Sequence, residues 1–401
     1  ARAESAGAIP ELLAEAWRRA LTPPSGPVFV EVPVDYLTAA TDSSLGELDG
    51  EPEQVPVPDV SEAARFLAEA EFPVVWAGGG VLRAGAWEEL AELARRLDAP
   101  VVTTYMGKSA CPEDDPLSAG SACDEGAFRK LVEGADVVLC VGTELGAETT
   151  GQYGFAFSGR IVQVDADPAR IGATYPAIGV VGDARAVLAA LLQQLPERSD
   201  NGAERAAAVR RRIEEGLADE GHDLERGLLE TIGATLPREA VQAWDMTILA
   251  YWAAAHVRAL SPRRFLYPLG SGTLGYAWPA ALGASLALPG TRALAIAGDG
   301  GVLYGLQELA TARQYGLDAV LLVVDDAGYG ILREYQRDSF GATIAVDLEQ
   351  PDFPAVARAF GVPAVSTSPE GLGEALEGAL GRDGPEVVHL PALLEMWAPT
   401  A

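Results

Sequence analysis

Cysteine and histidine are scarce in this chain. Its 401 residues include 3 cysteines and 3 histidines. Cys111, Cys123 and Cys140 show no CxxC spacing, which disfavours a disulfide framework and a zinc site, so we expect buried or partly exposed thiols. Three histidines are too few to favour a histidine-based catalytic triad or a histidine-rich metal site.

Long apolar runs and positive charge are also lacking. No apolar run approaches the roughly 18 residues of a membrane span, and no basic, apolar leader marks the N-terminus, so a cytoplasmic protein is the default expectation. The chain has 29 Lys and Arg against 58 Asp and Glu, a formal net charge of -29. A polyanion of this size is repelled by phosphate backbones and anionic lipids. Nucleic acids and membranes are therefore poor candidate partners.

The remaining composition is that of an ordinary globular protein, with 49% hydrophobic and 22% charged residues. A chain of this length accommodates two or three domains. Apolar segments of strand length alternate with helical periodicity over residues 58–195 and again over 226–401. Strands separated by helices indicate parallel sheets covered on both faces, so we predict an α/β fold with two doubly wound parallel-sheet domains.

Two polar segments interrupt this pattern. Residues 50–60 are rich in Pro, Glu and Asp, and residues 196–225 are strongly charged, so we predict two linkers, the second partly helical. Within residues 1–49 we expect a helix over 9–21 and a short buried strand over 28–32. The strands expected in the two domains cover residues 74–77, 101–104, 137–141, 161–164, 241–244, 265–267, 293–297, 319–324 and 387–390.

The most informative stretch carries two acidic loops. An apolar strand over 293–297 leads directly into Gly-Asp-Gly-Gly with Asp299, and a second over 319–324 leads into Asp-Asp with Asp326; a helical run over 306–315 lies between them. Ligands of open α/β sheets bind at the carboxyl ends of the strands. Asp299 and Asp326 are therefore expected to converge on one hard cation, Mg²⁺ or Ca²⁺.

The glycines beside Asp299 extend this prediction to a phosphate. They let backbone N–H groups approach a phosphate closely, with a helix N-terminus behind them. The alternative is that each aspartate only caps a turn or a helix. That alternative would be favoured for either aspartate alone, but the pair in a strand–helix–strand context favours a metal–diphosphate site.

The sequence GDGG…QELATARQYGL…VVDDAGYG resembles the diphosphate-binding signature of thiamine-diphosphate enzymes of the acetolactate synthase and 2-oxo-acid decarboxylase type. The resemblance implies thiamine diphosphate and Mg²⁺ as cofactors, with the metal held by Asp299, Asp326 and the Gly328 carbonyl. It also assigns Gly300, Gly301, Tyr329 and Gly330 to the cofactor site. This chain has Asp325-Asp326 where Asn-Asn is usual, and the added negative charge should tighten dependence on the divalent ion.

An upstream glycine-rich segment, residues 270–281, resembles the part of these enzymes that holds the cofactor rings. By resemblance the Gly272 carbonyl grips the aminopyrimidine, and the Leu274 side chain props the thiazolium into a bent conformation. Ordinary core packing is the alternative for Leu274. Thr247, in the loop after the strand over 241–244, corresponds to a contact with the outer phosphate.

The region 58–195 resembles the central, Rossmann-like domain of the same enzymes, and 226–401 their diphosphate-binding domain. Some relatives bind FAD in the central domain, so FAD is possible here but not expected, since Gly78-Gly79-Gly80 does not fit GxGxxG. Lys108 and Arg83 are the nearest basic candidates for an anionic group. Solvated surface positions are favoured for both.

The resemblance also implies that most of the family's pyrimidine-binding domain is not among these residues. Residues 8–33 are similar to only the last helix and strand of the family's pyrimidine-binding domain, which supplies the activating glutamate. Glu31 does not match that glutamate, so the catalytic residue stays unassigned. Either a split enzyme or a truncated chain would explain this. We then expect a partner polypeptide or second subunit that brings the pyrimidine-binding domain, in a homo- or hetero-oligomer.

The function implied is a thiamine-diphosphate-dependent carbon–carbon lyase or ligase acting on a small 2-oxo acid. Ile331, Leu332 and Glu334 follow the second acidic loop and are candidates for the substrate pocket, although helix packing explains them equally well. Two alternatives stay open. One is a non-catalytic regulatory or binding subunit that retains the fold, and the other is a flavin- or nucleotide-binding redox protein.

Overall fold

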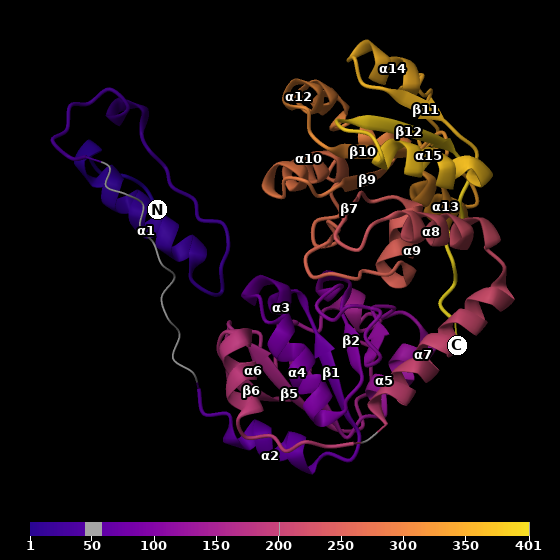
Figure 1. Ribbon diagram of the computed structural model, residues 1–401. Coiled ribbons are helices and arrows are strands. Elements are labelled where there is room, and N and C mark those ends of the chain that lie inside the picture. Colours follow the sequence, from indigo (N-terminus) through magenta and orange to yellow (C-terminus); the bar gives the residue numbers. More distant parts are fainter. Residues whose placement is uncertain (45–57, 200, 401) are drawn as a thin grey trace.

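The structure is a computed structural model that describes residues 1–44, 58–199 and 201–400. Its main body contains two six-stranded sheets, and every strand pair in both is parallel. Figure 1 shows the two sheets with their covering helices, one below the other. The predicted α/β fold with two parallel-sheet domains is therefore confirmed. Within the described residues, every helix is too short or too polar to span a lipid bilayer.

The first sheet has the strand order β3-β2-β1-β4-β5-β6. Its strands are β1 (Pro73–Ala77), β2 (Val101–Thr103), β3 (Ser118–Gly120), β4 (Val137–Val141), β5 (Arg160–Asp165) and β6 (Ala177–Val181). Its helices are α2 (Ser61–Glu69), α3 (Gly79–Ala84), α4 (Trp87–Leu97), α5 (Gly126–Glu133) and α6 (Ala184–Leu192). The apolar runs of β1 and β4 are buried along their whole length, as expected for strands covered on both faces.

The second sheet has the order β11-β12-β10-β9-β7-β8. Its strands are β7 (Val241–Trp244), β8 (Phe265–Leu266), β9 (Ala293–Gly298), β10 (Ala319–Asp325), β11 (Ala364–Ser366) and β12 (Glu386–Pro391). Its helices are α8 (Asp223–Thr235), α9 (Ile248–His256), α10 (Ala277–Ala287), α11 (Asp299–Val302), α12 (Leu309–Tyr315), α13 (Gly330–Phe340), α14 (Phe353–Ala359) and α15 (Leu372–Leu380). The strands β9 and β10 are neighbours, and their register pairs Val324 with Gly298, so both acidic loops leave the same edge of the sheet.

The N-terminal segment differs from its prediction. The helix α1 (Ile9–Leu21) is present, but the buried strand expected over 28–32 is wrong. Among the residues that the structure describes, this segment has one isolated bridge, between Arg2 and Glu31, and no sheet beside it, and Phe29 is 75% exposed. Figure 1 shows α1 and its flanking chain apart from both sheets. The linker expected over 50–60 falls mostly on residues that the structure does not describe.

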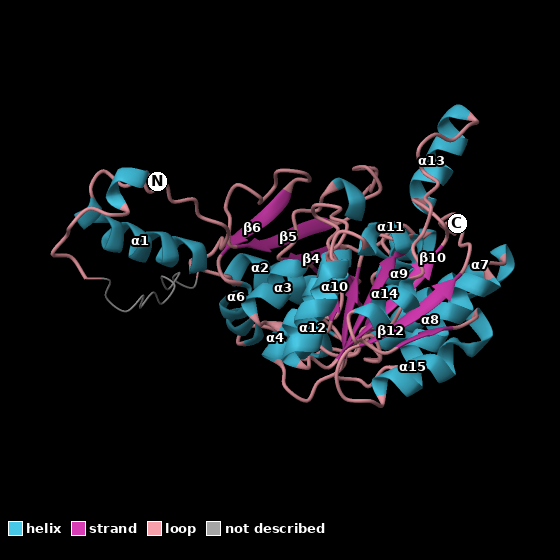
Figure 2. Cartoon of the chain, turned by 90° about the horizontal axis from the view of Figure 1, so that it is seen from above, coloured by secondary structure: helices cyan, strands magenta, loops and turns pink. Residues whose placement is uncertain are grey.

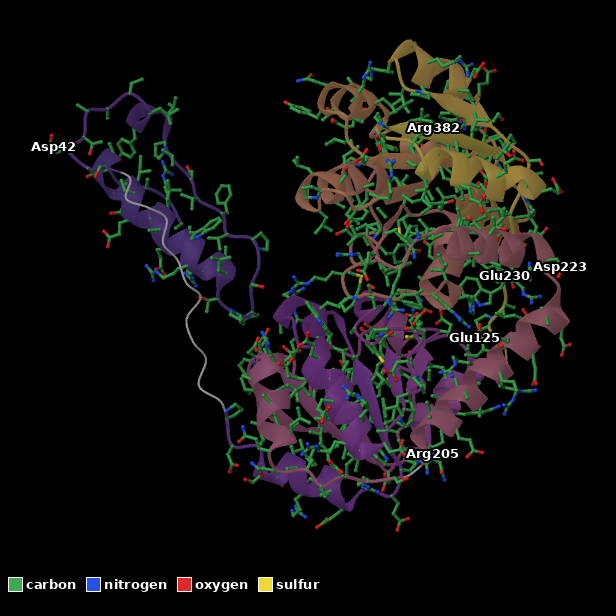
Figure 3. The ribbon with its side chains drawn as sticks, viewed as in Figure 1. Asp42, Glu125, Arg205, Asp223, Glu230 and Arg382 are labelled. Carbon is green, nitrogen blue, oxygen red and sulfur yellow. The ribbon has the colours of Figure 1, made fainter. Side chains whose placement is uncertain are left out.

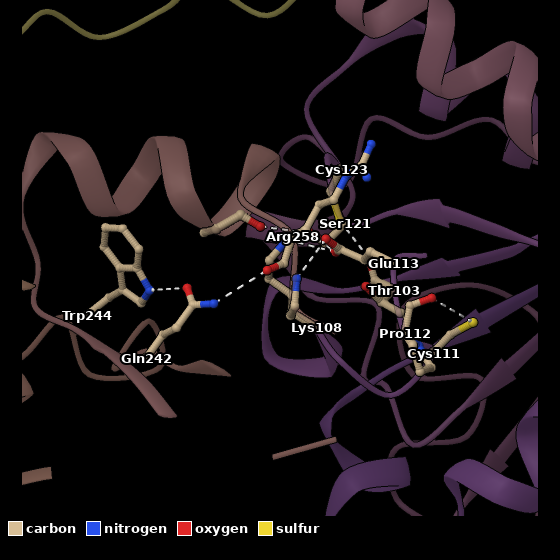
Figure 4. Close-up of polar contacts among 12 residues, drawn as sticks. Thr103, Lys108, Cys111, Pro112, Glu113, Ser121, Cys123, Gln242, Trp244 and Arg258 are labelled. Carbon is tan, nitrogen blue, oxygen red and sulfur yellow. Dashed lines mark hydrogen bonds and ion pairs between the residues drawn. The ribbon is translucent and has the colours of Figure 1, made fainter. Parts of the chain in front are cut away.

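A buried polar cluster joins the two domains and corrects the expectation for Lys108. Its side chain is fully buried rather than solvated, and its Nζ donates to Glu113 Oε1 and to Ser121 Oγ, each at 2.8 Å. Ser121 Oγ donates in turn to the Ala254 carbonyl at the end of α9. Glu113 also accepts from the Ala259 N–H. Figure 4 shows this cluster between the two domains, which it fixes in place.

The last residues strengthen the same junction. Beyond β12 the chain returns to the first domain, where Thr400 N and Trp397 Nε1 donate to the buried Glu125 carboxylate. The helix α7 (Gly202–Glu220) also runs from one domain to the other, and it occupies most of the segment expected to be the second linker. All three cysteines are buried free thiols, as expected.

Candidate active site

Two carboxylates meet at the carboxyl ends of β9 and β10. Asp299 begins α11 and is 1% exposed. Its Oδ2 accepts hydrogen bonds from the Gly328 N–H at 2.8 Å and from Gln350 Nε2. The loop after β10 is thereby tied to the loop after β9, which brings Asp326 beside Asp299. The structure thus unites the two aspartates that the sequence separates by a helix.

The electrostatics of this pair favour a cation between them. Burial raises the pKa of Asp299 to about 7, and the neighbouring Asp326 charge adds to the shift. Burial also raises the pKa of Asp326, while the Arg333 guanidinium opposes the shift. Asp326 Oδ1 is buried without a hydrogen-bond partner. Since buried polar atoms are rarely left unpaired, this oxygen is free to bind an ion.

The two aspartates of the Asp325-Asp326 pair have different surroundings. Asp325 lies 2.9 Å from His389 Nε2 and accepts from the Ala327 N–H at 3.0 Å, so both of its oxygens are engaged away from Asp299. Asp326 alone carries the unpaired oxygen. Of the two positions where Asn-Asn is usual, Asp325 therefore has a structural role and Asp326 belongs to the candidate metal site.

At three glycines of the predicted cofactor segment, there is no room for a side chain. A Cβ on Gly330 would lie 1.9 Å from Asp326 Oδ2, and one on Gly328 would lie 2.2 Å from the Val346 carbonyl oxygen. A Cβ on Gly300 would lie 2.6 Å from the Tyr329 ring. Larger residues would displace the carboxylate or the loop that carries it. The Tyr329 ring thus packs against Gly300, the residue after Asp299.

The glycine-rich loop lies against the same site. Gly301 faces the Leu274 side chain, whose Cδ2 is 3.5 Å from the position of a Cβ, and Gly298 faces Thr247 Oγ1 at 3.2 Å. Gly272 has a φ of +58°, a left-handed conformation that suits glycine, and no neighbour fills the space of a Cβ there. The sequence-predicted residues Thr247, Leu274 and Gly301 are thus brought together.

Two residues that position the site were missed by the sequence analysis. Asp245, buried after β7, accepts the Gly275 N–H on both oxygens at 2.9 and 3.1 Å and so holds the glycine-rich loop. A signal existed, because Asp245 is an acidic residue directly after a predicted strand. Gln350 lies 51 residues from Asp299 in a loop without a motif, and no local pattern marks it.

The cavity beside Asp326 has a volume of about 740 Å³ and is lined by Arg333, Glu334 and Arg337 of α13. Of the candidate pocket residues, Glu334 lines this cavity, Ile331 packs partly against the core, and Leu332 is 46% exposed. Figure 2 shows α13 projecting from the second sheet. No residue of this helix is buried, so one of its faces lacks a neighbour among the described residues.

Comparison with known proteins identifies the architecture. Residues 60–191 match the thiamine pyrophosphate enzyme central domain, and residues 245–390 match the C-terminal TPP binding domain of the same enzymes. A curated relative, the probable 2-ketoarginine decarboxylase AruI of Pseudomonas aeruginosa, is 36% identical over 393 residues, covering 95% of this chain and 69% of the relative. The chain belongs to the thiamine pyrophosphate enzyme family. The predicted resemblance is confirmed.

Other relatives in this family carry different activities in their names. The probable acetolactate synthase large subunit of Methanocaldococcus jannaschii is 33% identical, covering 95% of this chain and 69% of the relative. The sulfoacetaldehyde acetyltransferase of Castellaniella defragrans is 32% identical, covering 88% and 66%. Membership of the family is shared by a decarboxylase, a synthase and a transferase, so it leaves the substrate open.

The residues of this site fit thiamine diphosphate and a divalent ion. Within the described ranges, no group of three or more His, Cys, Asp or Glu side chains is arranged to hold a metal. An ion at Asp299 and Asp326 would therefore complete its shell with a backbone carbonyl and phosphate oxygens, which is the usual arrangement for Mg²⁺. The domain match implies the diphosphate that would supply those oxygens.

Proposed function

We propose that this chain is the cofactor-holding part of a thiamine-diphosphate-dependent carbon–carbon lyase or ligase that acts on a 2-oxo acid. The observation that carries the proposal is the pair Asp299 and Asp326 at adjacent strand ends, with a buried unpaired oxygen on Asp326. A site that no longer binds a cofactor would not need to keep this oxygen or the glycines packed around it. The proposal therefore favours an enzyme over a regulatory subunit that only retains the fold.

Each residue has a specific task in this proposal. Asp299, Asp326 and the Gly328 carbonyl hold Mg²⁺, while the backbone N–H groups of Gly300 and Gly301, at the start of α11, face the diphosphate. Leu274 supports the cofactor rings from the loop that Asp245 fixes, and the Gly272 carbonyl and Thr247 are further contacts. Tyr329 and Gly330 complete the loop around Asp326. Thiamine diphosphate, when bound, supplies the electron sink needed to break a bond beside a 2-oxo group.

The activating glutamate is proposed to come from a pyrimidine-binding domain outside these 401 residues, on a partner polypeptide or a second subunit. Apolar side chains are exposed around the proposed site, notably Tyr304 at 63%, Tyr335 at 53% and Phe340 at 80%. A surface of this kind is typical of a face that packs against another chain. An oligomer that completes the site is the corresponding expectation.

Carbon dioxide release tests this function. The purified chain is incubated with thiamine diphosphate, Mg²⁺ and a panel of 2-oxo acids, alone and with a candidate pyrimidine-binding polypeptide. We expect release only from the mixture and only with the metal present. Release by the chain alone would contradict the partner requirement. Bound cofactor without release from any mixture would contradict the lyase assignment and favour a binding subunit.

A further inference from the structure

A second cavity lies at the junction of the two domains, away from the aspartate pair. It has a volume of about 810 Å³ and is bounded by the edge strand β3, by α7 and α8, and by the segment between α9 and β8. Figure 1 shows α7, α8 and α9 near one another between the two sheets, and Figure 3 labels Glu230 of α8 at this junction. Any occupant would touch both domains.

The lining combines an apolar wall with arginines. Ile213, Leu217, Leu229 and Val257 are buried apolar residues of the wall. Five arginines also line the cavity: Arg210, Arg226, Arg238, Arg258 and Arg264. In a chain with a net charge of -29, this concentration of guanidinium groups runs against the general surface charge. Arginine forks match carboxylate and phosphate groups in particular.

Three of these arginines already have partners. Arg238 forms a two-pronged contact with Asp114, Arg210 donates to the Ser118 carbonyl, and Arg226 lies 3.6 Å from the exposed Asp223. The other two arginines of the lining, Arg258 and Arg264, lie in the short segment between α9 and β8.

Arg258 and Arg264 have unused donors. Among the described residues, Arg258 has no ion pair within 4.0 Å and no side-chain hydrogen bond; it is exposed, and its charge helps to lower the pKa of Asp114. Arg264 reaches Glu239 only at 4.0 Å, and its Nε is buried without a hydrogen-bond partner. A buried guanidinium N–H without an acceptor is uncommon and needs an explanation.

The acidic residues of the cavity do not supply that acceptor. Glu113 is occupied by Lys108 and by the Ala259 N–H, and Asp114 is paired with Arg238. Glu239, which does not line the cavity, accepts from Ser261. Glu214 and Glu230 lie on exposed faces of α7 and α8, at the rim.

We propose that this cavity binds a small ligand with an apolar body and a terminal oxyanion, which Arg258 and Arg264 hold while the body lies on the apolar wall. Carboxylates and phosphate esters share this chemistry. Because the ligand would contact both domains, its binding stabilises their relative placement. The inference does not depend on the proposed reaction, since none of these residues belongs to the aspartate site.

Calorimetric titration of the full chain tests the proposal with phenylacetate, phenyl phosphate and inorganic phosphate as probes. We expect saturable binding of one or both phenyl compounds and weaker binding of inorganic phosphate. Arg258→Gln and Arg264→Gln should each weaken binding of the phenyl probe roughly tenfold or more, the value of a lost charge-assisted hydrogen bond. The tighter phenyl probe distinguishes a carboxylate from a phosphate ligand.

Arg313→Gln is the matched control, because Arg313 is an exposed arginine on α12 that does not line the cavity. It should leave binding unchanged, and circular dichroism verifies that all three variants fold. Absence of saturable binding would overturn the proposal. So would equal affinity for all three variants, or inorganic phosphate binding as tightly as the phenyl probes.

Discussion

The two sheets have the same number of parallel strands, yet the crevices at their strand ends are occupied differently. In the first sheet the order reverses between β1 and β4, where a ligand would be expected. There the Gly80 N–H donates to the Gly142 carbonyl at 2.9 Å, and a Cβ on Gly80 would lie 2.6 Å from the Gly142 Cα. The backbone itself fills this part of the crevice.

In the second sheet the corresponding edge is lined by carboxylates. Asp245 follows β7, Asp299 follows β9 and Asp326 follows β10, and an unpaired oxygen remains. Both crevices contain glycines, but their roles differ. In the first sheet they let two backbone segments touch, and in the second they leave room for acidic side chains. The architecture thus allows a site at each crevice, and the residues at the strand ends decide whether one forms.

The joint between the sheets should be the most sensitive point for stability. Lys108→Met leaves Glu113 buried without its counter-charge, and breaking a buried ion pair in this way costs about 3–5 kcal/mol. Urea unfolding followed by tryptophan fluorescence measures the change. The double variant Lys108→Met/Glu113→Gln should recover part of the loss. A single variant as stable as the parent would contradict the role of the pair in joining the domains.

Alanine at one glycine of each crevice sharpens the comparison. Gly80→Ala forces the backbone of the first crevice apart and should cost about 1–3 kcal/mol of stability while leaving thiamine diphosphate affinity unchanged. Gly330→Ala should instead weaken that affinity, because its Cβ would displace the Asp326 carboxylate. Thermal unfolding and calorimetric titration are run on both variants. Similar losses of affinity for both would remove the distinction between the two crevices.

A smaller effect is expected from acid. Burial lowers the pKa of His256 from about 6.5 to about 3, with the Lys108 charge as a second cause. Below about pH 6.5, His256 therefore binds a proton in the unfolded chain but stays neutral in the folded chain. The His256 contribution to stability is complete above that pH and is lost toward pH 3, at about 1.4 kcal/mol per pH unit.

The pH dependence of unfolding in His256→Gln tests this sign. Relative to the variant, the parent should lose up to about 2 kcal/mol between pH 7 and pH 5. Glu125, 3.6 Å from His256 Nε2, has a pKa raised by burial and titrates in both proteins, so the difference isolates the histidine. Parallel pH profiles for parent and variant would show that His256 accepts a proton in the folded chain.

The sequence predicts the central strands of both sheets better than their edges. The strands β4 and β7 have the predicted limits because their apolar runs are buried on both faces. Three edge strands, β3, β6 and β11, went unpredicted. The strands β3 and β11 have three residues each and no apolar run, because an edge strand packs on fewer neighbours and tolerates small or polar side chains. The strand β6 does carry an apolar run, AIGVV, which the sequence analysis missed.

The candidate site likewise contains residues that the sequence predicts and residues that it does not. Asp299 and Asp326 each follow an apolar strand, so local order and parallel topology are enough to predict that they meet. Gln350 reaches Asp299 from a distant loop, and Lys108 became buried through a contact with Glu113 and the second domain. Such contacts depend on how separate segments pack, which no local periodicity records. FAD binding and the limits of the domains stay predictions.

The central claim is that Asp299 and Asp326 form a divalent-metal site for thiamine diphosphate. Calorimetric titration with the cofactor, with and without Mg²⁺, measures it directly for the parent, Asp299→Ala and Asp326→Asn. We predict metal-dependent binding by the parent, its loss in Asp299→Ala, and its retention with weaker metal dependence in Asp326→Asn, which keeps a ligand oxygen. Metal-dependent binding by Asp299→Ala with parental affinity would contradict the account.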